Sequence, residues 1–185
     1  MLYRPDIQRA ADAVLAGGVV VYPTEGVFGL GCLPDDARAV AQILRIKQRP
    51  AHKGMILIGS SLEQLMPWIE PTDEELGNLR SEVSHPTTWV VTASQCTPEW
   101  ITGGRNSVAV RICSHPVAAA LCDAANSALV STSANRSGRP AANNPITARY
   151  ITRNLCQAFV NGHTDPSLGS SEIRRASSGE VLRSA

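Results

Sequence analysis

Four short polar segments of this chain hold residue types that could bind an anion. They are 23–31 (PTEGVFGLG), 47–54 (KQRPAHKG), 108–112 (VAVRI) and 130–140 (VSTSANRSGRP). Lysine and arginine neutralise phosphate or carboxylate charge, and hydroxyl and amide groups hydrogen-bond sugars, phosphates or amino acids. Together the segments indicate an anion pocket with hydroxyl recognition. Such a pocket suits nucleotide chemistry, in which positioning and charge neutralisation do most of the work.

Three of these segments also have an ordinary structural explanation when each is taken alone. Segment 23–31 could be a glycine-rich turn between a strand and a helix, and no GxxxxGK[ST] P-loop occurs. Lys47, Arg49 and Lys53 could complement the dipole of a preceding helix. Arg111 ends an apolar strand and needs an anionic partner, which could be a structural carboxylate or a bound carboxylate or phosphate.

The segment at 130–140 ends an apolar run in a cluster of polar side chains. Val130 is followed by hydroxyl, amide and guanidinium groups, which are Ser131, Thr132, Ser133, Asn135, Arg136 and Arg139. A serine-rich turn is the simple alternative. Because ligands of α/β proteins gather where strands end, we expect these groups to line a binding site.

The elements that position these residues follow from hydrophobic periodicity and turn signals. We expect helices over 6–16, 35–49, 61–69, 72–83, 115–125 and 146–159, and strands over 19–23, 55–59, 87–94, 107–112 and 128–135. A β-hairpin around Ser-Ser-Gly is expected over 171–185, and strand and loop material over 84–105. The strand–helix alternation predicts one α/β domain over residues 1–185, with a mixed sheet.

Composition sets limits on the class of protein. The chain has 185 residues, 43% of them hydrophobic, and a formal net charge of +1, so charge alone predicts no nucleic-acid partner. Five cysteines form no CxxC pair and four histidines lack metal-ligand spacing, so we expect neither disulfides nor a metal site. No signal peptide or membrane-length apolar run occurs, which predicts a reduced cytoplasmic protein that binds no membrane.

Taken together and in order, four stretches resemble the YrdC family. They are VVVYPTEGVFGLGC, LRIKQRP, SVAVRI and STSANRSGRP, and the likeness is greatest to the short, single-domain bacterial members. The resemblance implies a twisted mixed β-sheet with flanking helices around a concave basic cavity. It also implies an ATP-dependent nucleotidyltransferase, which condenses L-threonine, bicarbonate or CO₂, and ATP with Mg²⁺ into threonylcarbamoyl-adenylate and pyrophosphate.

The family's product serves tRNA modification. Partner proteins transfer the threonylcarbamoyl group to the adenosine beside the anticodon in tRNAs that read codons beginning with A. Family members have also been regarded as RNA binders, so direct tRNA binding is a further expectation. An alternative hypothesis is that the chain is an RNA-binding or maturation factor that uses the basic cavity without chemistry. A third is a hydrolase or carbamoyl-transferring relative acting on another acyl phosphate.

The resemblance also assigns roles to residues by motif. The catalytic tetrad would be Lys47, Arg49, Ser133 and Asn135. The ATP site would contain Arg49, Lys53, Ser107, Ser133, Arg139 and Arg183. The threonine site would contain Thr24, Arg111, Ser131 and Ser171, and no metal ligands are implied.

Three regions depart from the family pattern. Gly26 stands where many relatives have threonine after Pro-Thr-Glu, and segment 83–88 (VSHPTT) replaces a Trp-Pro-Gly-Pro-x-Thr pattern. Ser170 and Arg175 stand where short relatives often have proline and aspartate. These departures concern threonine recognition more than the class of reaction.

Overall fold

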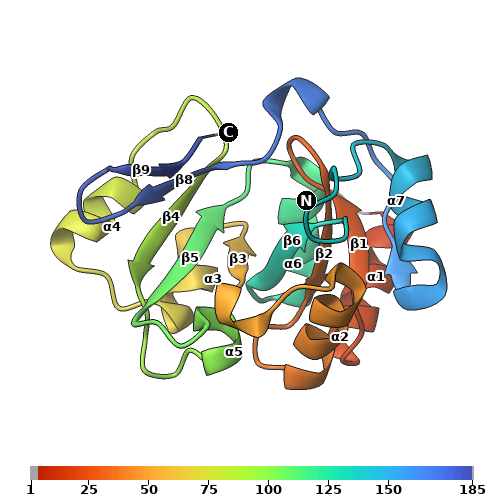
Figure 1. Ribbon diagram of the computed structural model, residues 1–185, viewed down its shortest axis with the longest axis horizontal. Helices are drawn as coiled ribbons and strands as arrows, with labels where there is room; N and C mark the ends of the chain where they lie inside the picture. Colours follow the sequence, from red (N-terminus) through yellow and green to blue (C-terminus); the bar gives the residue numbers. More distant parts are fainter. Residues whose placement is uncertain (1–3, 185) are drawn as a thin grey trace.

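The computed structural model describes residues 4–184, and they form an α/β fold around one mixed sheet (Figure 1). The strand order is β7-β1-β2-β6-β3-β5-β4-β8-β9, with β1–β7, β3–β5 and β4–β8 parallel and the other neighbours antiparallel. The strands are β1 (Val20–Pro23), β2 (Phe28–Cys32), β3 (Ile56–Gly59), β4 (Thr87–Thr92), β5 (Ser107–Ile112), β6 (Leu129–Ser133), β7 (Ala158–Phe159), β8 (Glu172–Arg175) and β9 (Val181–Arg183). The predicted mixed sheet and C-terminal hairpin are confirmed.

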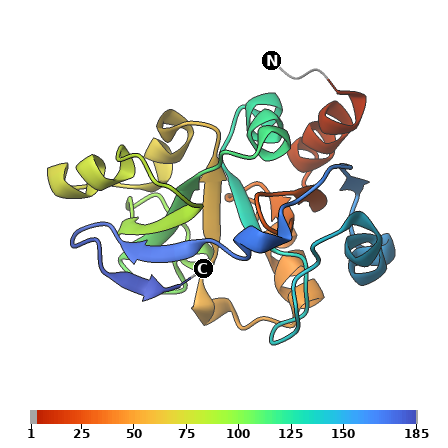
Figure 2. The ribbon, with the colours of Figure 1, turned by 90° about the horizontal axis from the view of Figure 1, so that it is seen from above.

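Helices cover both faces of the sheet. They are α1 (Pro5–Leu15), α2 (Ala37–Lys47), α3 (Leu62–Leu65), α4 (Asp73–Leu79), α5 (Glu99–Thr102), α6 (Pro116–Ala125) and α7 (Pro145–Thr152). Short 3₁₀ turns occur at η1 (Ala51–Lys53), η2 (Met66–Trp68), η3 (Arg153–Leu155) and η4 (Pro166–Leu168). In Figure 2, the red α1 and the green α6 lie together above the sheet, and the orange α2 lies below it.

The alternation of side chains along the strands divides the core between these two faces. In β1, Val20 and Tyr22 pack with α1 and α6, whereas Val21 packs with α2 on the opposite face. In β6, Leu129 faces the first cluster and Val130 the second. Since all these side chains are at most 1% exposed, the central strands are fixed by burial on both faces.

The local sequence sets the bounds of α2, which carries the first basic segment of the site. Asp36 caps its start, because its Oδ1 accepts hydrogen bonds of 2.9 Å from the backbone amides of Arg38 and Ala39. Gln48 ends it with a left-handed backbone, φ 51°. Lys47 is therefore the last helical residue and lies where the chain turns toward β3.

Two expectations about secondary structure are wrong. The glycine-rich part of 23–31 contains the buried strand β2, where a loop was expected. A Cβ atom at Gly31 would lie 2.7 Å from the Tyr22 ring, so glycine lets this strand pass a large aromatic side chain. The helix expected over 146–159 ends at Thr152, and Ala158–Phe159 instead pairs with β1 as β7. The helix ends there because Arg153 has a φ of 33°, which is not helical.

Candidate active site

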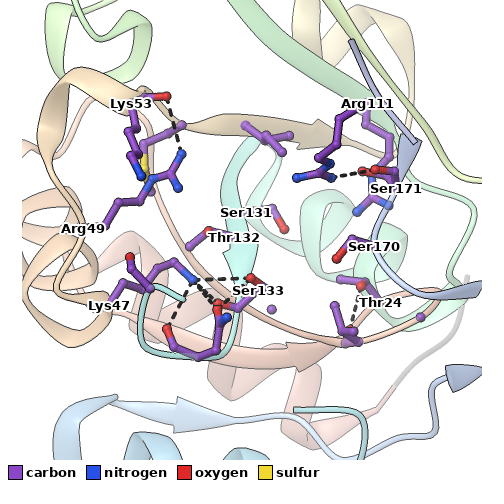
Figure 3. Close-up of a pocket in the computed structure, with 18 of the residues that line it drawn as sticks. Thr24, Lys47, Arg49, Lys53, Arg111, Ser131, Thr132, Ser133, Ser170 and Ser171 are labelled. Atoms are coloured by element: carbon purple, nitrogen blue, oxygen red, sulfur yellow. Dashed lines mark hydrogen bonds between the residues drawn. The ribbon is translucent and has the colours of Figure 1, made fainter. Parts of the chain in front are cut away.

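The polar end of β6 lies in the middle of the sheet and forms the floor of a pocket (Figure 3). Ser131 pairs with Gly31 of β2 and with Ile56 of β3, so the carboxyl end of β6 meets the beginning of β3. Segment 47–54 leads into that beginning and brings its bases to the hydroxyl groups. All charged side chains in this lining are cationic. They are Lys47, Arg49, Lys53, Arg111 and Arg183.

Lys47 is buried, with 3% of its surface exposed, and it binds the loop after β6. Its Nζ donates to Asn135 Oδ1 at 2.7 Å, to the Ser133 carbonyl, and over longer distances to Ser133 Oγ and the Asn135 carbonyl. Burial, and secondarily the charge of Arg49, lowers the pKa of Lys47 to about 8. All four acceptors are neutral, so the protein provides this ammonium with hydrogen bonds but with no counter-charge.

The loop after β6 is built around this lysine. Ser133 Oγ donates to Asn135 Oδ1 at 2.8 Å, and Asn135 Nδ2 donates to the carbonyl of Arg139. The backbone amide of Ser137 donates to the Lys47 carbonyl at 2.7 Å. Lys47, Ser133 and Asn135 are therefore one hydrogen-bonded unit, and any one of the three orients the other two.

A second group of cations lies beside this unit. Arg49 Nη2 donates to the carbonyl of Gly54 at 3.2 Å, and its buried Nε has no partner in the described residues. Burial, followed by the charges of Arg183 and Arg105, lowers the pKa of Arg49. Burial also lowers the pKa of Arg183, whose Nη2 donates to the Ser171 carbonyl at 2.6 Å. Like charges gathered in a pocket in this way favour a bound polyanion.

Arg111, on the far side of the pocket, has a counter-charge within the protein. Its Nη1 lies 2.8 Å from Glu25 Oε2, and its buried Nε has no partner in the described residues. Glu25 Oε1 accepts from the backbone amides of Ser114 at 2.9 Å and His115 at 3.3 Å. Burial by itself would raise the pKa of Glu25, but Arg111 and these amides outweigh burial and lower it. The structural ion pair considered from the sequence exists, and the guanidinium still lines the pocket.

Hydroxyl groups complete this side of the pocket. Thr24 Oγ1 donates to the Val27 carbonyl at 2.6 Å, which holds the turn between β1 and β2. Ser171 Oγ and Thr88 Oγ1 lie 2.8 Å apart. Figure 3 shows Thr24, Ser170 and Ser171 grouped near Arg111, with Ser131 between this group and the group of Lys47.

The structure brings together most of the residues that the sequence singled out. Ten of them line the pocket, namely Thr24, Lys47, Arg49, Lys53, Arg111, Ser131, Ser133, Asn135, Ser171 and Arg183. Ser107 does not line it, because it starts β5 and pairs with Thr92. Arg139 does not line it either and instead faces a separate groove. Sequence reasoning did not assign roles to Glu25, Ser137 or Ser170.

The three departures from the family pattern lie near one another. A Cβ atom at Gly26 would lie 1.9 Å from the carbonyl oxygen of Gly169, so no larger residue fits there without displacing that segment. His85 Nε2 lies 3.1 Å from Glu172 Oε1, and the amide of Glu172 donates to the Pro86 carbonyl. Segments 24–26, 85–88 and 169–172 thus pack together at the Arg111 side of the pocket.

Within 4–184, no group of three or more histidine, cysteine, aspartate or glutamate side chains is arranged to hold a metal ion. No helix in that range is both long enough and apolar enough to cross a membrane.

Residues 12–185 match the family model Sua5_yciO_yrdC, described as "Telomere recombination". The chain belongs to the Sua5/YciO/YrdC family. It is 45% identical over 181 residues to the threonylcarbamoyl-AMP synthase of Vibrio cholerae, with 96% of each chain covered. It is 47% identical over 182 residues to the same enzyme of Alkalilimnicola ehrlichii, with 96% of this chain and 94% of that one covered.

Solved structures agree with this assignment. P. abyssi Sua5 in complex with L-threonine superposes with a TM-score of 0.85 at 30% identity, over 91% of this chain and 50% of that one. The chain thus spans about half the length of that structural relative. E. coli YciO superposes with a TM-score of 0.83 over 96% of this chain and 87% of that one, and at 23% identity it supports the fold alone.

Proposed function

We propose that this chain is an ATP-dependent enzyme that makes threonylcarbamoyl-adenylate from L-threonine, bicarbonate and ATP, with release of pyrophosphate. The observation that carries the proposal is a pocket whose lining, within residues 4–184, contains five cationic side chains, a row of hydroxyls and no carboxylate. Relatives at 45–47% identity, covered over nearly their whole length, are named threonylcarbamoyl-AMP synthases.

The triphosphate would bind at the side of the pocket that contains Lys47, Arg49 and Lys53, and Arg183, which donates to the Ser171 carbonyl, would reach it from the Arg111 side. These cations have no carboxylate partner in residues 4–184, so their charge is available to phosphate oxygens. Arg49 Nε is buried and unpartnered, which makes it a ready donor to a bound anion. Mg²⁺ would enter with ATP, held by phosphates, water and hydroxyl groups, because it keeps several waters when phosphates bind it.

Threonine would bind at the Arg111 side. The ion pair with Glu25 fixes the guanidinium and leaves its Nε for the amino acid carboxylate. Ser171 and Ser131 supply hydroxyls close by, and the buried Thr88 hydroxyl holds that of Ser171. Polar partners for the threonine hydroxyl would discriminate against amino acids that lack it.

The chemistry needs no covalent nucleophile from the protein. The threonine amine and bicarbonate form a carbamate with loss of water, a carbamate oxygen attacks the α-phosphorus, and pyrophosphate leaves. The residues of this chain would hold the two substrates in line and neutralise charge on the phosphates. We propose Lys47 and Arg49, with Ser133 and Asn135, for the reacting centre, because Lys47, Ser133 and Asn135 form one hydrogen-bonded unit and the neighbouring Ser131 lies between the two sides of the pocket.

The proposed product also suggests partners and a place of action. An acyl-adenylate is a reactive donor, so a protein that transfers the threonylcarbamoyl group to tRNA adenosine would be its consumer. We propose the cytoplasm as the place of this reaction because ATP, threonine and tRNA meet there.

Pyrophosphate release from ATP and Mg²⁺, with L-threonine and bicarbonate omitted in turn, tests the proposal. We expect release only when both are present, and threonylcarbamoyl-adenylate among the products by mass spectrometry. Release with carbamoyl phosphate in place of bicarbonate would favour a carbamoyl-transferring enzyme. No release from folded protein, together with tight tRNA binding, would contradict the proposal and favour the RNA-binding alternative.

A further inference from the structure

The phenol of Tyr22 is a buried polar group to which the reaction described above assigns no role. Tyr22 belongs to β1 and is 0% exposed, and its hydroxyl has no hydrogen-bond partner within residues 4–184. A buried hydroxyl without a partner lowers stability, because it has given up its hydrogen bonds to water. Its place beneath a substrate pocket therefore indicates a use in function and not in folding.

Two glycines of β2 let the Tyr22 ring cross this strand. Tyr22 lies opposite Gly29, and Val20 lies opposite Gly31 on the same face of the sheet. A Cβ at Gly31 would lie 2.7 Å from Tyr22 Cε1 and 2.9 Å from its Oη, and a Cβ at Gly29 would lie 3.4 Å from its Cε2. The Cβ at Gly31 would also lie 2.7 Å from the Val130 carbonyl oxygen of β6. The ring therefore lies over both glycines, and its hydroxyl extends toward β6.

Ser131 of β6 is the polar side chain that this hydroxyl approaches. Ser131 follows Leu129 by two residues, and Leu129 packs in one cluster with Tyr22, so all three side chains point to the same face. A Cβ at Gly29 would lie 3.4 Å from Ser131 Oγ as well as from the Tyr22 ring. Burial raises the pKa of Tyr22, and the Ser131 hydroxyl is the largest influence that opposes burial. The two hydroxyls are thus neighbours, although their geometry is not that of a hydrogen bond.

The surroundings of the phenol favour Ser131 as its acceptor. Within the described part of the chain, the other side chains of the cluster around Tyr22 are apolar or carry thiols, which are weak acceptors. Because burial raises its pKa, the phenol stays protonated at neutral pH and acts as a donor. A serine that accepts from Tyr22 has its own proton left to donate into the pocket.

Arg111 completes the row of donors on this face of the sheet. Arg111 of β5 lies opposite Ile58 of β3, and Ser131 of β6 lies opposite Ile56, so both side chains flank β3 on one face. The buried Nε of Arg111 has no partner in the described residues. Figure 3 shows Ser131 between the Arg111 group and the Lys47 group. An anionic oxygen bound between Ser131 and Arg111 would receive a hydrogen bond from each.

We propose that Tyr22 is a positioning residue for threonine, whose hydroxyl donates to Ser131 Oγ and so fixes Ser131 as a donor to the threonine carboxylate. This inference rests on the proposed function, because it takes threonine as the occupant of the Arg111 side. A donor that itself accepts a hydrogen bond is polarised and binds an anion more strongly. The two glycines of β2 acquire a purpose beyond packing, since they allow the phenol to reach Ser131.

Calorimetric titration with L-threonine and with L-threoninamide, which lacks the carboxylate, tests the proposal. Tyr22→Phe keeps the ring and removes only the hydroxyl, so we expect threonine affinity to fall about 3- to 10-fold, the effect of one hydrogen bond. The preference for threonine over threoninamide should narrow by the same factor. The affinity for ATP should not change. The melting temperature should stay the same or rise slightly, because the lost hydroxyl has no partner in the described residues.

Two further variants separate a positioning role from a structural one. Ser131→Ala should lose at least as much threonine affinity as Tyr22→Phe, and the double variant should lose no more than Ser131→Ala, because Tyr22 acts through Ser131. Tyr150→Phe is the matched control, since it removes a tyrosine hydroxyl from a side chain that is 67% exposed and does not line the pocket. It should bind threonine like the parent protein.

Threonine binding is measured without turnover, so the two proposals can fail separately. A parent protein that binds threonine but releases no pyrophosphate would contradict the proposed function alone, and one that binds no threonine would overturn both. Unchanged threonine affinity in Tyr22→Phe, or an equal loss for threoninamide, would overturn the role of Tyr22. So would fully additive losses in the double variant, an equal loss in Tyr150→Phe, or a large fall in the melting temperature of Tyr22→Phe.

Discussion

Lys47 and Arg111 lie on different sides of one pocket, and the protein holds them in different ways (Figure 3). Lys47 is surrounded by carbonyl, hydroxyl and amide oxygens, which carry no charge. Arg111 is paired with the carboxylate of Glu25, which is itself held by backbone amides. Both are buried cations, so burial alone does not distinguish them.

The difference concerns where positive charge remains available. Around Lys47 the charges of Arg49 and Lys53 have no carboxylate partner in the described residues and add up, which suits a triphosphate. Around Arg111 the charge is already neutralised, and what remains is a directed donor, which suits one carboxylate. The same difference predicts that the Arg111 side contributes more to folding and the Lys47 side more to nucleotide binding.

Substitution of Arg111 should have the largest effect on the fold. Arg111→Met leaves the buried Glu25 carboxylate without its cation, and breaking a buried ion pair costs about 3–5 kcal/mol. Chemical denaturation would measure this loss in the free energy of unfolding. The double variant Glu25→Gln, Arg111→Met should recover part of it. No recovery would show that the pair does not act as a unit.

Arg49→Ala should lower turnover about 100- to 1000-fold, the effect of removing one preorganised charge from a reacting site. The melting temperature should change little, because Arg49 donates only to the carbonyls of Lys53 and Gly54.

Lys47→Met should lose a similar amount of activity but also have a lower melting temperature, since Asn135 Oδ1 loses a donor. Full activity in both variants would disprove the assignment of the catalytic unit.

Gly26→Thr tests the Arg111 side of the pocket, because Gly26 packs there against the backbone of Gly169. The new Cβ would overlap the Gly169 carbonyl, so we expect the free energy of unfolding to fall by about 1–3 kcal/mol. The KM for threonine should rise more than the KM for ATP. Gly77→Ala is a control, because a Cβ at this helical glycine meets nothing within 4 Å. It should stabilise the protein slightly. Equal KM changes for both substrates in Gly26→Thr would contradict a threonine-specific side.

Titration of Lys47 should change both kcat/KM and the free energy of unfolding with pH, and the two changes should have opposite signs. Its pKa in the folded protein is about 8, below the ordinary value of 10.5, so kcat/KM for ATP should fall as pH rises through 8. Between these two values the unfolded chain binds more protons, so the Lys47 contribution makes the free energy of unfolding rise with pH. Lys47→Arg should remove both trends. A profile unchanged in that variant would assign the titration to another group.

The sequence alone predicted the residue types of the site better than their partners. The polar groups at the end of the apolar strands β6 and β5 could be read directly, because burial on both faces forces such strands into the sheet. The basic end of α2 at Lys47 could be read from helical periodicity. The hydrogen bonds from Lys47 to Asn135 join residues 88 positions apart, and no local pattern predicts that separation. Glu25 was missed as the partner of Arg111 for the same reason.

The errors in secondary structure have a local cause. Gly29 and Gly31 made β2 look like a loop, although at Gly31 close packing against Tyr22 is what requires glycine. At the β7 edge of the sheet, the helical periodicity of 146–159 continues past Arg153 in the sequence. The chain there instead forms β7, which pairs with β1. In both places tertiary packing overrode the local propensity.

The central claim is that the two sides of the pocket hold different substrates, and calorimetric titration of two variants tests it most directly. L-Threonine and ATP with Mg²⁺ would be titrated separately into Arg49→Ala and Arg111→Lys, the second of which keeps a cation beside Glu25. We expect Arg49→Ala to lose ATP affinity and keep threonine affinity, and Arg111→Lys to do the reverse. If either variant lost affinity for both ligands, or if the two variants showed the opposite pattern, the assignment of different substrates to the two sides would be wrong.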